Sequence, residues 1–226
     1  MSITLVSLSL VLVVSALLIG TGLKKQPGLG IFGALAIIGF SLWLHGESIA
    51  SLGFGFPHNW WQTVLLGLAL GTVIQLISVA LIEPFADRVT GGTHDHSIVA
   101  NVKGSWKAFV QWMLIVWMFV ALLEEGIYRG FLMTEMVKII GTDSWAIVIN
   151  ILVSSIVFGL SHGYQGRSGI LSTAIIGVLL GCIFVWGGFN LWLVIFTHGF
   201  IDTVGIALIA IDADKLIQNK IWKTAK

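Results

Sequence analysis

The chain has 226 residues, of which 57% are hydrophobic and 10% are charged, and its mean hydropathy is +0.98. Soluble domains carry about 25% charged residues, so this composition excludes an ordinary soluble protein. The net charge of +1 says nothing about nucleic acid, and no basic stripe supports it, so we expect no nucleic-acid partner. We therefore expect an all-α fold, a polytopic bundle of seven or eight transmembrane helices in the lipid bilayer.

Apolar runs of about 20 residues are long enough to cross a bilayer as helices, and seven candidates follow one another. They cover residues 3–20, 29–44, 60–82, 105–140, 145–162, 170–186 and 189–211. The fourth run would measure about 54 Å as one straight helix, which exceeds the hydrocarbon core of about 30 Å. It must tilt, kink or begin at the interface, or it holds two segments, which would give eight helices. The first run lacks a basic n-region and a cleavage site, so we expect an anchor and not a cleaved signal.

Lysine and arginine gather in alternate loops. They occur in loop 22–28, in loop 88–107, at Arg167 and in the C-terminal tail, which carries Lys215, Lys220, Lys223 and Lys226. The loops at 45–59 and 187–188 contain neither residue. The positive-inside rule then predicts a multi-pass protein of the cell membrane, with its N-terminus outside and its C-terminus in the cytoplasm.

Two adjacent carboxylates, Glu124 and Glu125, lie at the end of an apolar run. A charged side chain in the bilayer core costs roughly 2.5–3.5 kcal/mol on insertion scales, so such groups are expected to face a bundle interior or a wet cavity. Arg129 follows Glu125 by four residues and can pair with it on a helix. Glu124 has no partner at that spacing, which makes it a candidate general base. The alternative is a structural ion pair beside a carboxyl at a water-filled interface.

His162 ends the fifth apolar run, and His198 lies within the seventh. Because the fourth and fifth helices form a hairpin around 141–143, Glu124 and His162 should lie at nearly equal depth, about 25 and 28 Å from the turn. His198 and Asp202 are four residues apart on one helical face, so Asp202 can orient the imidazole. Phe158 precedes His162 by four residues and can wall the same pocket. A carboxyl base, two imidazoles and an orienting carboxyl suffice for hydrolysis of an acyl bond by activated water.

Together these three motifs resemble those of the CPBP family. The pattern is Glu124-Glu125-x-x-x-Arg129, then Phe158-x-x-x-His162, then His198-x-x-x-Asp202. The family contains the CAAX prenyl proteases and bacteriocin-processing proteins, also called the Abi family. The resemblance covers residues 105–211, so we expect one integral membrane domain over 1–226, with N-terminal helices in 1–104 and a CPBP-like catalytic core in 105–211.

The resemblance implies an intramembrane endopeptidase related to the Ras-converting CAAX protease, acting on a protein or peptide substrate without a metal or other cofactor. Glu124 would activate water with help from His162. His198 and Asp202 would hold the oxyanion, while Glu125 and Arg129 would form a neighbouring structural pair. The eukaryotic branch has asparagine at the last position. Ionised Asp202 cannot donate a hydrogen bond, so it must be protonated or must act by orienting His198.

Other functions remain open at this point. The same Glu and His residues could bind Zn²⁺ with an open water position, which would make the protein a metalloprotease. A bacteriocin-immunity or scaffold protein could keep the fold without catalysis. Carboxylates and histidines also build proton relays in transporters, although no inverted repeat is visible. The oligomeric state, the substrate and its prenylation cannot be inferred from the residues.

A few polar groups fall outside these motifs. His94-Asp95-His96 lies in a polar loop, which we expect to be solvated, with a surface metal site as the alternative. Glu135 and Lys138 are three residues apart and should form an ion pair on one helix. The single Cys182 excludes an intramolecular disulfide framework and a cysteine-ligated zinc site, and we expect it to be a buried packing residue rather than a catalytic thiol.

Overall fold

The computed structural model describes residues 3–222, and this part of the chain is built from helices, with no strand. Within residues 3–222, seven helical segments are long and apolar enough to cross a membrane, which confirms the all-α polytopic bundle. They are Leu5–Leu23, Pro27–His45, Trp60–Thr90, Trp106–Ile140, Ser144–Ser161, Gly163–Trp186 and Leu191–Ala210. Lys223 and Lys226 of the basic tail lie outside the described residues.

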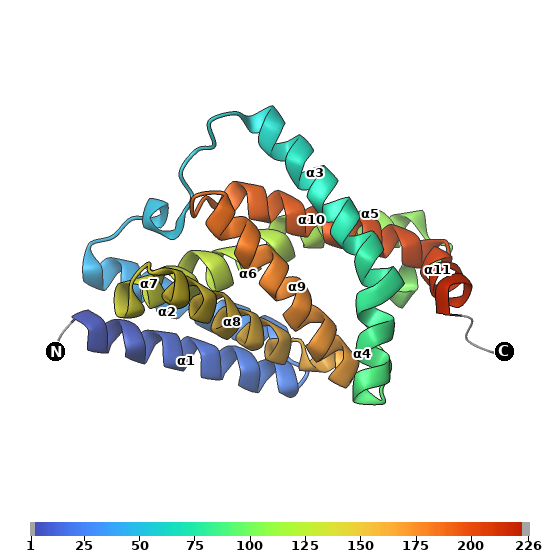
Figure 1. The fold of residues 1–226 in the computed structure, drawn as a ribbon, viewed down its shortest axis with the longest axis horizontal. Coiled ribbons are helices and arrows are strands. Elements are labelled where there is room, and N and C mark those ends of the chain that lie inside the picture. Colours follow the sequence, from blue (N-terminus) through green and yellow to red (C-terminus); the bar gives the residue numbers. More distant parts are fainter. Residues whose placement is uncertain (1–2, 223–226) are drawn as a thin grey trace.

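Figure 1 shows how these segments are arranged. The α-helices are α1 (Ile3–Leu23), α2 (Pro27–His45), α3 (Trp60–Ile77), α4 (Glu83–Thr90), α5 (Trp106–Ile115), α6 (Ala121–Glu125), α7 (Thr134–Ile140), α8 (Ser144–Ser161), α9 (Gly166–Trp186), α10 (Leu191–Ala210) and α11 (Ala213–Trp222). Short 3₁₀ turns are η1 (Ile49–Leu52), η3 (Ser97–Val102) and η6 (Gly163–Gln165). Wider π-helical segments are η2 (Ser78–Ile82), η4 (Val116–Val120) and η5 (Gly126–Met133).

The fourth membrane segment is one helix and not two. Residues 106–140 run without a break through α5, η4, α6, η5 and α7, so the count of seven holds. Both wide turns, η4 and η5, flank α6. Insertions of this kind are rare and occur frequently at functional sites.

Residues 126–133 of this helix are the centre of the core. Every residue of η5 is buried. Ile127 and Phe131 belong to an apolar cluster shared with α1, α2 and α8. Met133 belongs to a second cluster shared with α9 and α10. Glu124 and Glu125, which precede η5, therefore lie between the cluster shared with α1, α2 and α8 and the cluster shared with α9 and α10.

Helix α3 crosses α10 at close range, as Figure 1 shows in the upper part of the molecule. Two glycines of α3 make this approach possible. A Cβ atom on Gly67 would lie 2.5 Å from Cβ of Phe196, and one on Gly71 would lie 2.5 Å from the carbonyl oxygen of Thr197. Small residues at helix contacts are the usual means of close packing within membranes.

The polar stretch after residue 82 is more ordered than its composition predicts. Helix α3 continues through η2 into α4 and ends at Gly91, which has a left-handed φ of +65°. The C-terminal tail also forms a helix, α11, and does not extend freely. The indole N–H of Trp222 donates to the carbonyl of Ala80 at 2.7 Å, and the guanidinium of Arg88 lies 4.0 Å above the Trp222 ring. These contacts fix α11 against η2 and α4.

Candidate active site

Glu124 and Glu125 end the short helix α6, between the two wide turns. Although they are adjacent in sequence, they have different surroundings. Glu124 is 7% exposed and lines a cavity of about 360 Å³. Glu125 is fully buried and does not line that cavity. One carboxylate thus faces open space while the other faces the protein interior.

Glu124 lies opposite His162, as the hairpin geometry predicts. Oε2 of Glu124 is 3.8 Å from Nε2 of His162. His162 follows the last turn of α8, where its Nδ1 lies 2.8 Å from the carbonyl oxygen of Phe158. Because a carbonyl only accepts, Nδ1 must carry the proton. Neutral His162 therefore directs an unprotonated Nε2 toward Glu124.

His198 is anchored by Glu125. Nδ1 of His198 lies 2.6 Å from Oε1 of Glu125, and the same oxygen accepts a hydrogen bond from Nη1 of Arg129 at 2.8 Å. Nη2 of Arg129 donates to the carbonyl of Gly177 on α9 at 3.0 Å. The predicted Glu125–Arg129 pair is present, and it also orients a histidine 73 residues away.

Asp202 lies at the other nitrogen of His198. Its Oδ2 is 3.7 Å from Nε2, too far for a hydrogen bond. The orienting contact expected from Asp202 is therefore made by Glu125, on the opposite side of the ring. Asp202 instead contributes negative charge where Nε2 faces the cavity.

Phe158 fills the space between the two histidines. Its ring centroid lies 4.6 Å from that of His162 and 6.0 Å from that of His198, both in edge contacts. The guanidinium carbon of Arg129 lies 4.7 Å from the same ring. Phe158 therefore sets the spacing of the two imidazoles and covers the buried cation.

All candidate residues thus meet in one region. The cavity is lined by Glu124, Phe158, His162, His198 and Asp202, while Glu125 and Arg129 support it from behind. Its apolar wall comes mainly from α5, η4, α9 and α10, through Trp112, Ile115, Val116, Val120, Ile176, Ile201, Ile206 and Ile209.

Two tyrosines were not identified from the sequence. Tyr164 lines the cavity, with its ring centroid 5.5 Å from that of His162. The hydroxyl of Tyr128 donates to that of Ser161 at 2.6 Å, next to His162. Tyr164 follows the motif histidine by two residues, which is the only sequence signal that could have identified it.

The Glu135–Lys138 pair is present, with Nζ and Oε1 at 2.7 Å. The same ammonium also binds Glu47 at 2.7 Å. This second contact ties the loop after α2 to α7, away from the cavity. The expectation of a buried Cys182 is wrong, because this residue is exposed on the surface of α9.

Residues 106–204 match the model of a family described as type II CAAX prenyl endopeptidase Rce1-like. This segment belongs to the CAAX protease family. The match lies within residues 105–211 and contains all seven candidate residues of the CAAX-protease motifs. No curated protein and no solved structure matches the chain. The matched segment is thus similar to CAAX prenyl endopeptidases, and the seven apolar helices among the described residues support a multi-pass membrane protein.

Proposed function

We propose that the protein hydrolyses peptide bonds of a membrane-associated protein or peptide with a water molecule activated by Glu124 and His162. The observation that carries this proposal is the 3.8 Å separation of Oε2 of Glu124 and Nε2 of His162 at the cavity wall. Both atoms are acceptors, so they cannot bond directly. A polar gap longer than about 3.5 Å suits a bridging water. Such a water would donate one proton to each base and direct its lone pair into the cavity.

The second histidine is suited to stabilise negative charge. With its Nδ1–H donated to Glu125, His198 can donate from Nε2 only as an imidazolium. Glu125 and Asp202 flank the ring and favour that cation. Nε2–H then supports the oxygen that becomes negative in the tetrahedral intermediate. The proposed division of labour is Glu124 and His162 for water, and His198 with Asp202 for the oxyanion.

The proposed substrate is a peptide segment presented from the membrane. Apolar side chains of α5, η4, α9 and α10 line the cavity beside the polar cluster, so it can hold an apolar stretch of chain next to the two bases. Nothing in these contacts requires a prenyl group. Prenylated and unprenylated peptides are therefore tested side by side.

The experiment uses the purified full-length protein in detergent. It is incubated with a farnesylated CAAX peptide, the same peptide without the lipid, and a peptide library, and products are identified by mass spectrometry. We expect cleavage by the wild type and by Asp143→Asn, a control on an exposed turn. Glu124→Gln and His162→Ala should lose activity. Equal cleavage by all four proteins would overturn the proposed roles.

The zinc alternative predicts a different response to chelation. If Glu124, His162 and His198 held a catalytic metal, a strong chelator would abolish cleavage and Zn²⁺ would restore it. Hydrolysis by Glu124 and His162 alone should survive prolonged chelation. A non-catalytic immunity or scaffold protein would instead keep its cellular phenotype in the Glu124→Gln variant.

We also propose that the site opens toward the cytoplasm. The basic loops lie together, since Asp95 N–H donates to the Gln165 carbonyl and Lys103 pairs with Asp212. The loops without Lys or Arg also meet each other, because the Asn190 side chain donates to the Gly55 carbonyl at 2.7 Å. Labelling of single cysteines at Arg167 and Gly55, after Cys182→Ser, tests the orientation. Labelling of position 167 from the outer side would contradict it.

A further inference from the structure

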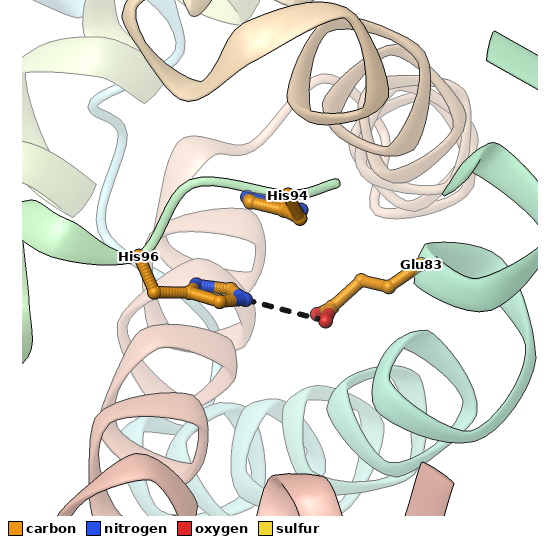
Figure 2. A group of neighbouring side chains, drawn as sticks. All are labelled: Glu83, His94 and His96. Atoms are coloured by element: carbon orange, nitrogen blue, oxygen red, sulfur yellow. Dashed lines mark ion pairs between the residues drawn. The ribbon is translucent and has the colours of Figure 1, made fainter. Parts of the chain in front are cut away.

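A second group of potential metal ligands lines the same cavity as the candidate active site. Glu83 begins α4, and His94 and His96 belong to the loop that follows it (Figure 2). One ligand atom from each residue lies within 4.8 Å of the others. These residues precede the segment that matches the CAAX proteases. They are thus a feature of this chain outside the family core.

The loop that carries the two histidines is held in place. Gly91 ends α4 in a left-handed conformation, which turns the chain back toward α9. The carboxylate of Asp87 then accepts hydrogen bonds from the backbone N–H of His94 and the hydroxyl of Ser168. The backbone N–H of Asp95 donates to the Gln165 carbonyl at 3.1 Å. The loop expected to be solvated is therefore fixed over the cavity.

Each potential ligand has a defined direction. Nε2 of His96 lies 3.4 Å from Oε2 of Glu83, the contact drawn in Figure 2. Nδ1 of His94 lies 3.0 Å from the hydroxyl of Ser172, so Nε2 is the ring nitrogen that a metal would bind in place of its neighbour Gln165. Ligating histidines ordinarily use their second nitrogen in this way. The two imidazoles stack with centroids 4.3 Å apart and planes 8° apart, so one ring must rotate for the lone pairs to converge.

The local charge also favours a cation. Glu83 is 4% exposed, and its contacts are the Ser78 hydroxyl, the Gln218 amide and His96. Asp214 is 7% exposed, its Oδ1 has no hydrogen-bond partner among the described residues, and it acts electrostatically on His96. Buried carboxylates require pairing or a metal ion. The guanidinium of Arg88 on α4 lies over the Trp222 ring and does not pair with either of these carboxylates.

We propose that Glu83, His94 and His96 bind a divalent transition-metal ion of the zinc class, separate from the candidate catalytic residues. Two imidazoles and one carboxylate form the ligand set of open zinc sites, with the fourth position left for water or substrate. Oxygen-preferring ions such as Mg²⁺ fit this set less well. A bound ion would join α4 to the loop after it, and through Gln218 to α11. This proposal does not depend on the hydrolytic activity.

The test measures bound metal directly. The full-length protein is purified in detergent with a histidine-free affinity tag, stripped by chelation, equilibrated with Zn²⁺ and separated from free ion. Metal content is then measured by mass spectrometry. We expect about one zinc ion per chain for the wild type, and at least tenfold less bound zinc for Glu83→Gln and for His94→Ala/His96→Ala.

Two controls separate this site from others. His45→Ala/His58→Ala removes the same number of histidines from the opposite loop and should keep the zinc. His162→Ala/His198→Ala removes the candidate catalytic imidazoles and should also keep it. Zinc lost in this second variant but retained without His94 and His96 would overturn the proposal. So would a wild type that binds no zinc.

A thermal measurement guards against misfolding of the variants. Metal that binds only the folded state raises the unfolding temperature. Zn²⁺ should therefore raise the Tm of the wild type and of both control variants, whereas the Glu83→Gln Tm should not respond. Equal metal-free Tm values show that the fold is intact. A zinc-dependent increase of equal size in Glu83→Gln would contradict the assignment of that ligand.

Discussion

Nδ1 of His198 lies 2.6 Å from Oε1 of Glu125, and that oxygen also accepts from Arg129. The second glutamate of the motif is thus the residue that holds the second histidine in place. Because one oxygen serves both partners, the cation, carboxylate and imidazole form a single buried unit. Removing any one of them should disturb the other two.

The first prediction concerns the stability of this unit. Arg129→Met should destabilise the protein by about 3–5 kcal/mol, because it leaves a buried carboxylate without its cation. Unfolding in detergent, followed by circular dichroism, measures the loss. Arg167→Met, at an exposed position, should change stability by less than about 0.5 kcal/mol. Similar losses of stability in both variants would show that the buried Arg129–Glu125 pair contributes no more to folding than an exposed arginine does.

The second prediction concerns cooperation between Glu124 and His162. If both bind one water, removing either should reduce kcat by about 10²–10⁴-fold, with a smaller change in KM. The double variant Glu124→Gln/His162→Gln should then be little worse than the poorer single variant, since residues that act as a unit are non-additive. Steady-state kinetics on a cleaved peptide test this. Losses that multiply would mean that the two residues act in separate steps.

The third prediction concerns Asp202. Since Glu125 already orients His198, the structure does not require a charge at position 202 for that purpose. Asp202→Asn keeps the shape and offers an N–H donor toward the cavity, so it should retain activity within about tenfold. Asp202→Leu leaves no polar group beside Nε2 of His198, so it should lose about 10²-fold or more, a loss comparable to that of an oxyanion-stabilising group. If asparagine is as inactive as leucine, the negative charge itself is needed.

Hydropathy and helical spacing predicted much of this architecture. The membrane segments follow from apolar length, and the approach of Glu124 to His162 follows from a hairpin whose two arms rise by equal amounts. The i,i+4 spacing also placed His198 and Asp202 on one face. These features depend on local periodicity, which sequence contains directly.

The remaining features depend on contacts between distant segments. No residue pattern marks the wide turns η4 and η5 on either side of α6. Glu125 and His198 are 73 residues apart. Glu83 meets His94 and His96 only because α4 extends a polar sequence as a helix and Gly91 reverses it. Tertiary packing, and not local preference, determines these positions.

The fourth prediction concerns the salt bridge of Glu47. Burial raises the pKa of Glu47, but the hydrogen bond and charge of Lys138 outweigh it and lower the pKa overall. A lowered pKa in the folded state contributes stability at neutral pH that is lost as pH falls through that pKa. Glu47→Gln should therefore cost about 0.2–1 kcal/mol at pH 7, and the difference should shrink on acidification. Lys138→Met also removes the cation from buried Glu135, so a double-mutant cycle with Glu47→Gln isolates the Glu47–Lys138 interaction. A difference from wild type that persists unchanged at low pH would argue against the ion pair.

The fifth prediction concerns the crossing of α3 and α10. Gly71→Val places side-chain atoms where the carbonyl of Thr197 and Cβ of Phe200 already lie, at 2.5 and 2.7 Å from the added Cβ. Overpacking of this kind costs about 1–3 kcal/mol, so the Tm in detergent should fall. Gly39→Val, on α2, is the control, because no atom lies within 4 Å of its added Cβ. Helix α10 also carries His198 and Asp202, so Gly71→Val should lower peptidase activity as well. A Tm equal to that of the control would mean that the two helices are not in close contact in detergent.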